Sequence, residues 1–174
     1  MAGYRKLLPS EAGRLRRHLL RLTPEERRMR FHGALADAAI DRLCDRIDWF
    51  RTILIGYFVE GRLRGVAQLV FDRTLCPRTV EVAVTVERPW QGRGVGTELT
   101  RRAVTIARNR GAERQIMFCL VENLPMRRIA RKLESALAFD GGNLAADLGL
   151  RGATPWSLLE EVVQDGTGSW LADG

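Results

Sequence analysis

Two periods of apolar residues predict the secondary structure of the middle of the chain. Residues 79–86 have valine at every second position, which predicts a strand with one buried face. Residues 95–107 have apolar side chains every three or four positions, which predicts a helix that packs on one side. Residues 115–121 form a short apolar run, long enough for a buried strand and too short for most helices. This order predicts a right-handed crossover between two parallel strands.

The flanking segments predict further strands and helices. Apolar runs at residues 52–60 and 63–71 predict a β-hairpin, and Gly141-Gly142 predicts a second hairpin turn between residues 136–140 and 143–150. Thr23-Pro24-Glu25-Glu26 carries the residues of a helix capping box. We also expect a strand at residues 4–8 and helices at residues 10–22, 34–48 and 125–133. The fold class is therefore α/β (α+β): a mixed, mostly antiparallel sheet of about seven strands, with parallel central strands and helices on both faces.

Size and composition limit the class of protein. With 174 residues, 45% of them apolar, the chain is expected to form one domain at residues 1–150 and a tail at residues 151–174 that can form a short helix. No apolar run approaches the roughly 18 residues of a transmembrane helix, and the first ten residues lack an apolar signal core, so neither a membrane span nor secretion is expected. Three scattered cysteines without C-x-x-C spacing favour free thiols and a cytoplasmic location. No His, Cys or carboxylate cluster has metal-ligand spacing, so no metal is expected.

The net charge of +7 is unevenly distributed. Residues 1–30 carry nine basic and three acidic side chains, residues 73–134 carry thirteen and six, and the last forty residues carry one and six. A basic core attracts a polyanion such as coenzyme A or nucleic acid. Because the basic segments lack interleaved aromatic residues, nucleic acid is the least favoured partner and none is expected.

A glycine-rich segment lies where the central strand meets the following helix. It runs Gln91-Gly92-Arg93-Gly94-Val95-Gly96-Thr97. A helix start presents unpaired N–H groups and a partial positive charge, and glycine lets a phosphate approach the backbone closely. The spacing is neither that of a P-loop nor that of the G-x-G-x-x-G dinucleotide motif. We interpret the segment as a pyrophosphate cradle; the alternative is a tight turn whose glycines serve only the backbone.

Together these motifs resemble the GCN5-related N-acetyltransferases, the GNAT family. The family motif R/Q-x-x-G-x-G/A is matched by Gln91, Gly94 and Gly96, and the order of elements matches over most of residues 1–150. The segments T-P-E-E-R-R-M-R-F-H-G, from Thr23, and V-E-V-A-V-T-V, from Val80, resemble the acetyltransferase domain of bacterial protein-lysine acetyltransferases. The resemblance implies acetyl-CoA as cosubstrate and transfer of its acetyl group to a primary amine, either a protein lysine or a small molecule, by direct attack in a ternary complex.

The resemblance also assigns residues to the cofactor. It implies that the two central parallel strands splay apart and that the pantetheine arm pairs with strand backbone in the gap. The residues expected to contact acetyl-CoA are Thr85, Val86, Glu87, Gln91, Gly92, Arg93, Gly94, Val95, Gly96, Thr97, Asn123 and Met126. Asn123 has an alternative role as the N-cap of the next helix.

Glu81 is the expected catalytic residue. It is the only carboxylate on the central strand upstream of the expected cofactor contacts, and partial burial would raise its pKa toward the range that suits a general base. The alternative is an exposed strand glutamate. Many family members use a tyrosine to protonate the leaving thiolate; Ala130 occupies that position, so the general acid is unassigned. Cys119 offers a covalent route by its chemistry, but its strand is expected to be buried.

Besides nucleic-acid binding, the sequence is compatible with two functions. The first is an acetyl-CoA-dependent N-acetyltransferase, and the alternative is a non-catalytic acyl-CoA-binding regulatory domain with the same fold, which the missing tyrosine favours. An acidic stripe on residues 34–48, formed by Asp37, Asp41, Asp45 and Asp48, either receives a cationic acceptor or is a solvated face. The tryptophan-bearing tail could pack on a neighbour, so a homodimer is also compatible with the sequence.

Overall fold

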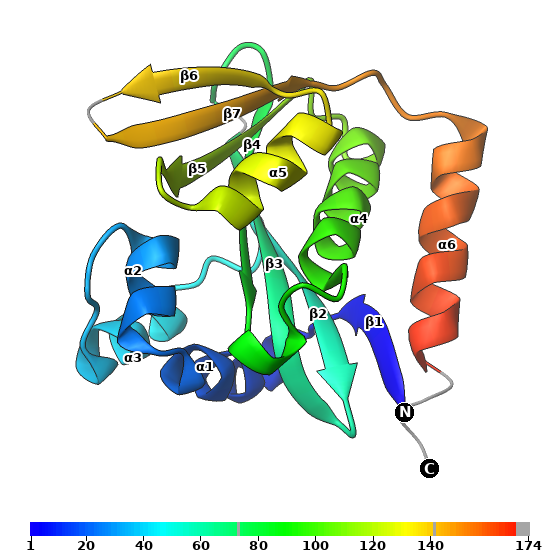
Figure 1. The fold of residues 1–174 in the computed structure, drawn as a ribbon. Helices are drawn as coiled ribbons and strands as arrows, with labels where there is room; N and C mark the ends of the chain where they lie inside the picture. The colour runs from blue at the N-terminus through cyan, green and yellow to red at the C-terminus, as the bar shows by residue number, and fades with distance from the viewer. Residues whose placement is uncertain (73, 141, 170–174) are drawn as a thin grey trace.

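The computed structural model describes residues 1–72, 74–140 and 142–169; Gly141 and Trp170, which belong to the predicted turn and tail, lie outside them. One sheet of seven strands has the order β1-β2-β3-β4-β5-β7-β6 (Figure 1). The strands are β1 (Ala2–Lys6), β2 (Thr52–Val59), β3 (Arg62–Asp72), β4 (Thr79–Val86), β5 (Arg114–Leu120), β6 (Ala136–Asp140) and β7 (Asn143–Gly149). Among the strands of the described residues only β4 and β5 pair in parallel, so the predicted fold class is confirmed.

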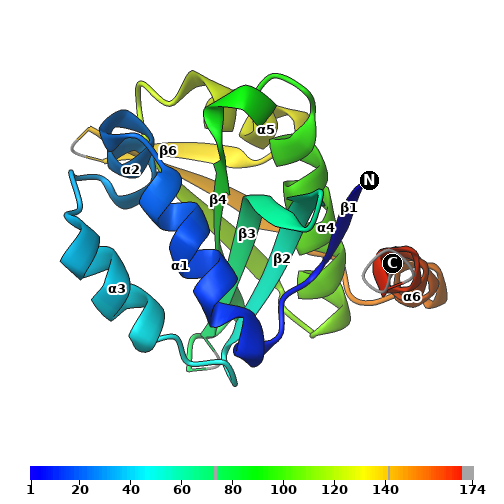
Figure 2. The ribbon, with the colours of Figure 1, turned by 90° about the horizontal axis from the view of Figure 1, so that it is seen from below.

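Helices cover both faces of the sheet (Figure 2). They are α1 (Ala12–Arg21), α2 (Pro24–Phe31), α3 (Asp37–Asp45), α4 (Val95–Asn109), α5 (Leu124–Lys132) and α6 (Pro155–Ser169), with 3-10 turns at Pro9–Glu11 and Arg88–Trp90. α1, α2 and α3 lie on one face, where Leu19 and Ile40 belong to one buried cluster. α4 and α5 lie on the other face, where Leu99 and Ala103 belong to a second cluster.

Capping explains two helix boundaries. α2 begins at the predicted capping box: the Thr23 hydroxyl accepts the Glu26 N–H at 3.2 Å, and the Glu26 carboxylate accepts the Thr23 N–H at 2.8 Å. α3 is shorter than the predicted residues 34–48. Its N-cap is Ala36, whose side chain makes no capping hydrogen bond, and the Asp48 carboxylate instead accepts the Phe50 N–H at 3.0 Å in the following turn.

β4 and β5 pair only at their starts. Their register joins Thr79 to Arg114, Val80 to Gln115 and Glu81 to Ile116, and within the described residues it goes no further. Beyond this point β5 turns away beside β7, whereas β4 continues beside β3 (Figure 1). The carboxyl-terminal halves of the two strands therefore enclose a wedge.

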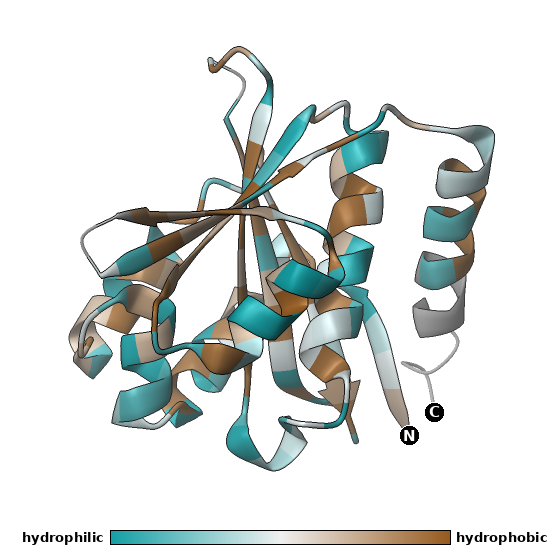
Figure 3. Ribbon diagram, turned by 45° about the horizontal axis from the view of Figure 1, so that its top comes forward, coloured by the Kyte–Doolittle hydropathy of each residue, from teal (hydrophilic) through white to brown (hydrophobic). Residues whose placement is uncertain are grey.

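α6 packs with its polar side against the domain. Ser157, Glu161 and Gln164 are buried, and the Glu161 carboxylate pairs with Lys6 at 2.6 Å and with Arg110 at 3.0 Å. Its apolar residues colour the outer side of the α6 ribbon (Figure 3). They are exposed, by 48 to 76% for Trp156, Leu158, Leu159, Val162 and Val163. Within the described residues, no helix combines the length and apolar character needed to cross a bilayer.

Gln115 on β5 is a fully buried amide, and neither its Oε1 nor its Nε2 has a hydrogen-bond partner within the described residues. An unsatisfied buried amide destabilises a fold, and methionine has nearly the same shape without the polar atoms. We expect Gln115→Met to raise the free energy of unfolding by about 1–2 kcal/mol, measured by urea denaturation.

Gln68→Met is the matched control. The Gln68 Oε1 accepts the Arg30 guanidinium at 2.9 Å, so its loss should lower the free energy of unfolding. A Gln115→Met protein that is less stable than the wild type would contradict the assignment of Gln115 as a destabilising residue.

Candidate functional site

A cleft of about 600 Å³ occupies the wedge between β4 and β5. Its walls come from β4, the loop before α4, the start of α5, and α2. Most of the predicted cofactor residues line it: Thr85, Val86, Gln91, Gly92, Gly94, Gly96, Thr97, Asn123 and Met126. Glu87 and Val95 are instead buried, and the Arg93 guanidinium lies 5.1 Å from the Trp90 ring centroid.

The backbone of every second β4 residue points into the cleft. The Glu87 N–H donates to the Arg64 carbonyl of β3 at 2.9 Å, so the backbone of Glu87 faces β3. Because the N–H and C=O groups of a strand alternate between its two neighbours, Thr85 also faces β3, whereas Val84 and Val86 face the wedge. Val84, which the sequence predictions did not include, lines the cleft. These two valines offer backbone hydrogen bonds that suit an extended chain containing amides.

The glycine loop leaves the start of α4 open to the cleft. Gly92 and Gly94 have φ values of +71° and +81°, a conformation that favours glycine, and a Cβ at either would meet no atom within 4 Å. Gly94 is the N-cap of α4 and provides no side-chain cap, so the first N–H groups of the helix lack acceptors. At Gly96 a Cβ would lie 3.3 Å from the Ile129 Cδ1. The absence of a side chain at Gly96 therefore lets α5 pack closely against α4. The loop therefore has the open backbone and exposed donors that an anion needs.

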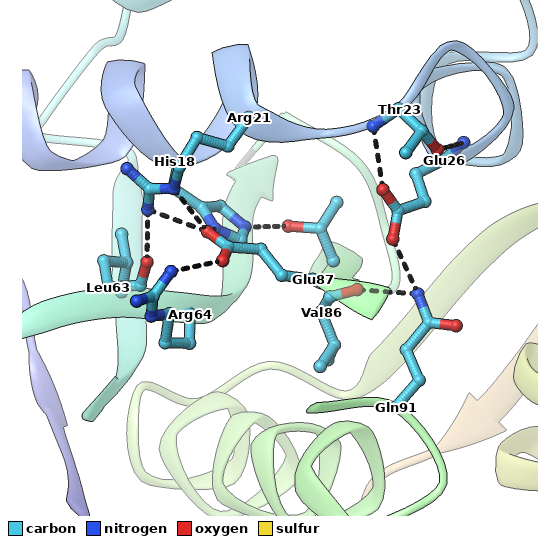
Figure 4. A network of polar contacts seen from close by, with 10 residues as sticks. His18, Arg21, Thr23, Glu26, Leu63, Arg64, Val86, Glu87 and Gln91 are labelled. Carbon is cyan, nitrogen blue, oxygen red and sulfur yellow. Dashed lines mark hydrogen bonds and ion pairs between the residues drawn. The ribbon is translucent and has the colours of Figure 1, made fainter. Parts of the chain in front are cut away.

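Gln91 holds this loop against the end of β4 (Figure 4). Its Nε2 donates to the Val86 carbonyl at 2.8 Å and to the Glu26 carboxylate at 3.0 Å. The same carboxylate caps α2 through the Thr23 N–H. Gln91 therefore fixes the shape of the cleft, and the Val86 N–H remains as the backbone donor.

Glu87 is the centre of a buried ion-pair network (Figure 4). Its carboxylate accepts Arg21 Nε at 2.9 Å and Arg64 Nη1 at 2.9 Å, and lies 3.1 Å from His18 Nδ1. His18 Nε2 lies 2.8 Å from the Thr85 hydroxyl. Since a carboxylate only accepts, a neutral His18 must carry its proton on Nδ1 and accept from the Thr85 hydroxyl at Nε2. The network ties α1 and β3 to the end of β4 beside the cleft.

The pKa values in this network follow from burial and from its hydrogen bonds. Burial alone would raise the pKa of Glu87, but hydrogen bonds from His18, Arg21 and Arg64 together outweigh it and hold the pKa at about 2. Burial lowers the pKa of His18 and outweighs the opposing effect of Glu87, so the imidazole stays neutral near pH 7. The network therefore contains two arginines and one carboxylate, with a fixed histidine tautomer.

Unpaired basic side chains surround the cleft. Arg88, Arg128 and Lys132 line it, are exposed, and make no ion pair within the described residues. The acidic neighbours Glu25 and Glu122 both pair with Arg28, at 2.9 Å and 2.5 Å, so this guanidinium offsets one of their two charges. With Arg28 included, the basic side chains at the cleft still outnumber the acidic ones, Glu25, Glu26 and Glu122. The positive charge left over suits a polyphosphate.

Asn123 is the N-cap of α5. Its side-chain oxygen accepts the Met126 N–H at 3.2 Å, the alternative role considered for it. Its Nδ2 has no partner within the described residues, and the side chain also lines the cleft. The residue can thus cap the helix with its oxygen and donate into the cleft with its nitrogen.

Glu81 lines a second cavity, of about 630 Å³, between α3 and strands β2 to β4. It is exposed, the alternative placement considered for it, and lies about 13 Å along β4 from Thr85. Arg30 lines both this cavity and the cleft, and its guanidinium donates to the Gln68 amide oxygen at 2.9 Å. Burial lowers the pKa of Arg30 to about 10, although the nearby Glu81 carboxylate acts in the opposite direction. The two spaces therefore adjoin at Arg30.

No tyrosine in the described part of the chain lines the cleft. The two tyrosines, Tyr4 and Tyr57, contact each other with ring centroids 4.8 Å apart on β1 and β2, and Ala130 is buried. Burial raises the pKa of the Cys119 thiol, which disfavours a thiolate nucleophile. The described residues contain no group of three or more His, Cys, Asp or Glu that could hold a metal ion.

Sequence reasoning missed several residues beside the cleft. Arg128 and Lys132 stand four residues apart on α5 and so share one face of the helix, a signal that was available beside Asn123. His18 gave no signal, because its partners Thr85 and Glu87 are 67 and 69 residues away.

Comparisons with known proteins agree with this geometry. A family model described as Acetyltransferase (GNAT) family matches residues 15–134. The acetyltransferase PA5475 of Pseudomonas aeruginosa is 30% identical over 142 residues, which cover 79% of this chain and 74% of that protein. The GNAT domain of S. lividans PAT has a TM-score of 0.71 at 21% identity, covering 84% of this chain and 89% of that one. The putative acetyltransferase yncA from Salmonella typhimurium, solved with acetyl-CoA, has a TM-score of 0.65 at 16% identity, covering 89% and 98%.

Glu87→Gln should destabilise the protein at neutral pH, and the difference should disappear in acid. The pKa of Glu87 is about 2 in the folded protein, below the ordinary value of 4.5. A lowered pKa stabilises the fold above pH 4.5, here by on the order of 3 kcal/mol, and this contribution is lost as the pH falls toward 2. Urea denaturation of both proteins at pH 7 and at several points from pH 4.5 to 2 measures the difference.

The exposed Glu113, changed to glutamine, is the control for loss of one surface carboxylate. A stability difference between wild type and Glu87→Gln that stays constant over this pH range would contradict the role given to Glu87.

Proposed function

The chain belongs to the GNAT family of acetyltransferases, and from this premise we propose that it transfers the acetyl group of acetyl-CoA to a primary amine, by direct attack of the amine within a ternary complex. The observation that carries the proposal is the cleft at the β4–β5 wedge, which combines unpaired β4 backbone with the open start of α4. The acceptor is a protein lysine or a small-molecule amine. The cytoplasmic location expected from the cysteines stays a prediction.

Different groups of the protein bind different parts of the cofactor. The N–H groups at the start of α4, with Gly92 and Gly94, receive the pyrophosphate, and Arg128 and Lys132 add charge at the mouth. The backbone of Val84 and Val86 pairs with the amides of the pantetheine arm. The pyrophosphate lies at the Val86 end of the cleft, so the thioester at the other end of the arm lies nearer Val84. The Val84 N–H is then the donor nearest the thioester oxygen, where negative charge develops during attack.

Glu81 serves as the base in this proposal. An ammonium cannot attack a thioester, so the amine must lose a proton before or during transfer, and Glu81 accepts it directly or through water. The thiolate is a tolerable leaving group, with an ordinary thiol pKa near ~8.5, so the reaction can proceed without a tyrosine acid.

The homodimer considered from the sequence also stays a prediction. The apolar outer side of α6, formed by Trp156, Leu159 and Val162 with their neighbours, is the surface on which a second copy would pack. Light scattering on wild type and on Trp156→Ser measures this: a dimer mass for the wild type and a monomer mass for the variant are expected, and a wild-type monomer contradicts the dimer.

Gly94→Glu should abolish acetyl-CoA binding. A carboxylate at this position enters the space where the pyrophosphate would lie and repels it. Calorimetric titration with acetyl-CoA should give a micromolar dissociation constant for the wild type and at least about a hundredfold weaker binding for the variant.

Gly61→Glu is the matched control, because Gly61 also has a positive φ, +71°, and open space around it, but lies in the β2–β3 turn. Gly61→Glu introduces the same negative charge, and the conformational strain of a non-glycine residue at positive φ is similar at both positions. Equal loss of binding in both variants, or no binding by the wild type at millimolar acetyl-CoA, would contradict the proposed cofactor site.

Glu81→Gln should lower kcat about 10²- to 10⁴-fold and leave the dissociation constant for acetyl-CoA unchanged. The control is Glu60→Gln, an exposed glutamate of the β2–β3 turn. The measurement is a thiol-release assay with a panel of amines. Full activity of Glu81→Gln would remove Glu81 from the mechanism, and tight acetyl-CoA binding without turnover of any amine would support a non-catalytic acyl-CoA-binding domain instead.

A further inference from the structure

The cavity that contains Glu81 is strongly basic. Its charged lining consists of Arg30, Arg42, Arg46 and Arg51 against Asp48 and Glu81. Its floor is formed by Gln68, Val70 and Ala83 of the sheet, and its outer wall by α3. A volume of about 630 Å³ falls in the range that holds a small molecule or a peptide side chain.

Two of these arginines have no carboxylate partner. Arg42 and Arg46 stand one helical turn apart on α3, are exposed, and make no ion pair within the described residues. By contrast, Arg51 on the same cavity pairs with Asp72 at 3.6 Å. Two neighbouring guanidinium groups on the wall of one cavity offer a set of donors that matches a carboxylate or a phosphate.

Three of the four aspartates of the acidic stripe, Asp37, Asp41 and Asp45, do not line this cavity, whereas Asp48 does. Asp37 pairs with Arg27 at 2.7 Å, Asp41 with Arg16 at 3.4 Å, and Asp45 also with Arg16. Those carboxylates therefore hold α3 against α1 and α2. These three exposed and paired carboxylates favour the alternative considered for the stripe, a solvated face.

We propose that this cavity binds the acidic group of the acceptor, so that the acceptor is an amine that also carries a carboxylate or a phosphate. Arg42 and Arg46 hold the acidic group, and the amine lies beside Glu81 and Arg30, where the cavity adjoins the cleft. The assignment of the ligand as the acceptor rests on the proposed function, whereas anion binding at Arg42 and Arg46 does not. A polycationic acceptor is disfavoured, because the four arginines that line the cavity would repel it.

The first experiment measures binding without turnover. The full chain, labelled with ¹⁵N, is titrated with 4-aminobutyrate, with 3-aminopropylphosphonate, and with butylamine, which lacks the acid. We expect the two acid-bearing amines to shift the signals of Arg42 and Arg46, and butylamine to leave them unchanged. Arg42→Gln/Arg46→Gln should weaken binding of both acids at least about tenfold, since each lost charge-assisted contact contributes.

A matched control separates the site from the net charge. Arg62→Gln/Arg151→Gln removes the same charge at two exposed arginines that also make no ion pair within the described residues and that do not line this cavity. It should bind the acids as the wild type does. Equal weakening in both double variants, equal binding of butylamine, or shifts confined to other residues would overturn the inference.

The second experiment adds acetyl-CoA and measures acetylation. For an acid-bearing amine, Arg42→Gln/Arg46→Gln should raise KM at least about tenfold with kcat and acetyl-CoA binding unchanged. If acetylation persists but KM does not respond to this variant, the inference fails and the proposed function stands. If acetyl-CoA does not bind, the proposed function fails, and the titration still decides whether the anion site exists.

Discussion

The divergence of β4 from β5 is the constraint on which the rest of the site depends. Two parallel strands that stayed paired would use their backbone groups on each other, and no chain could enter between them. Here the pairing stops after Glu81 and Ile116, so Val84 and Val86 keep backbone groups turned to an open wedge. Such groups are costly to bury unpaired, so the wedge must either admit water or bind a ligand with its own amides. A ligand of that kind is what acetyl-CoA offers.

Several contacts maintain the wedge from its sides. Gln91 connects the glycine loop to β4 and to α2, and the capping oxygen of Asn123 fixes the start of α5 opposite. Below the wedge, Glu87 joins α1, β3 and β4 through a buried network whose pKa values keep the carboxylate charged and His18 neutral. The charges that support the site are therefore internal and paired. Arg88, Arg128 and Lys132 at the cleft, and Arg42 and Arg46 at the second cavity, make no ion pair within the described residues.

The fold and the residues that line the cleft at the β4–β5 wedge could largely be predicted from the sequence, because their signals are local. The valine alternation gave β4, and the glycine spacing gave the start of α4. The acceptor side could not be predicted, since it depends on contacts between distant segments. Asp41 and Asp45 were identified as part of an acidic stripe, but only the folded chain shows that both pair with Arg16 and that Arg42 lines the cavity. The role of His18 could likewise not be predicted from the sequence, because it depends on contacts with Thr85 and Glu87, which are distant along the chain.

Backbone amide hydrogen exchange with and without acetyl-CoA tests the central claim most directly. If the cofactor lies in the wedge, the amides of Val86 and of Val95 to Thr97 should become protected on its addition, because they then donate to the cofactor rather than to water. Amides of α3 around Arg42 should exchange at the same rate in both states. Protection at α3 with none at β4 or the start of α4 would contradict the account and place the cofactor elsewhere.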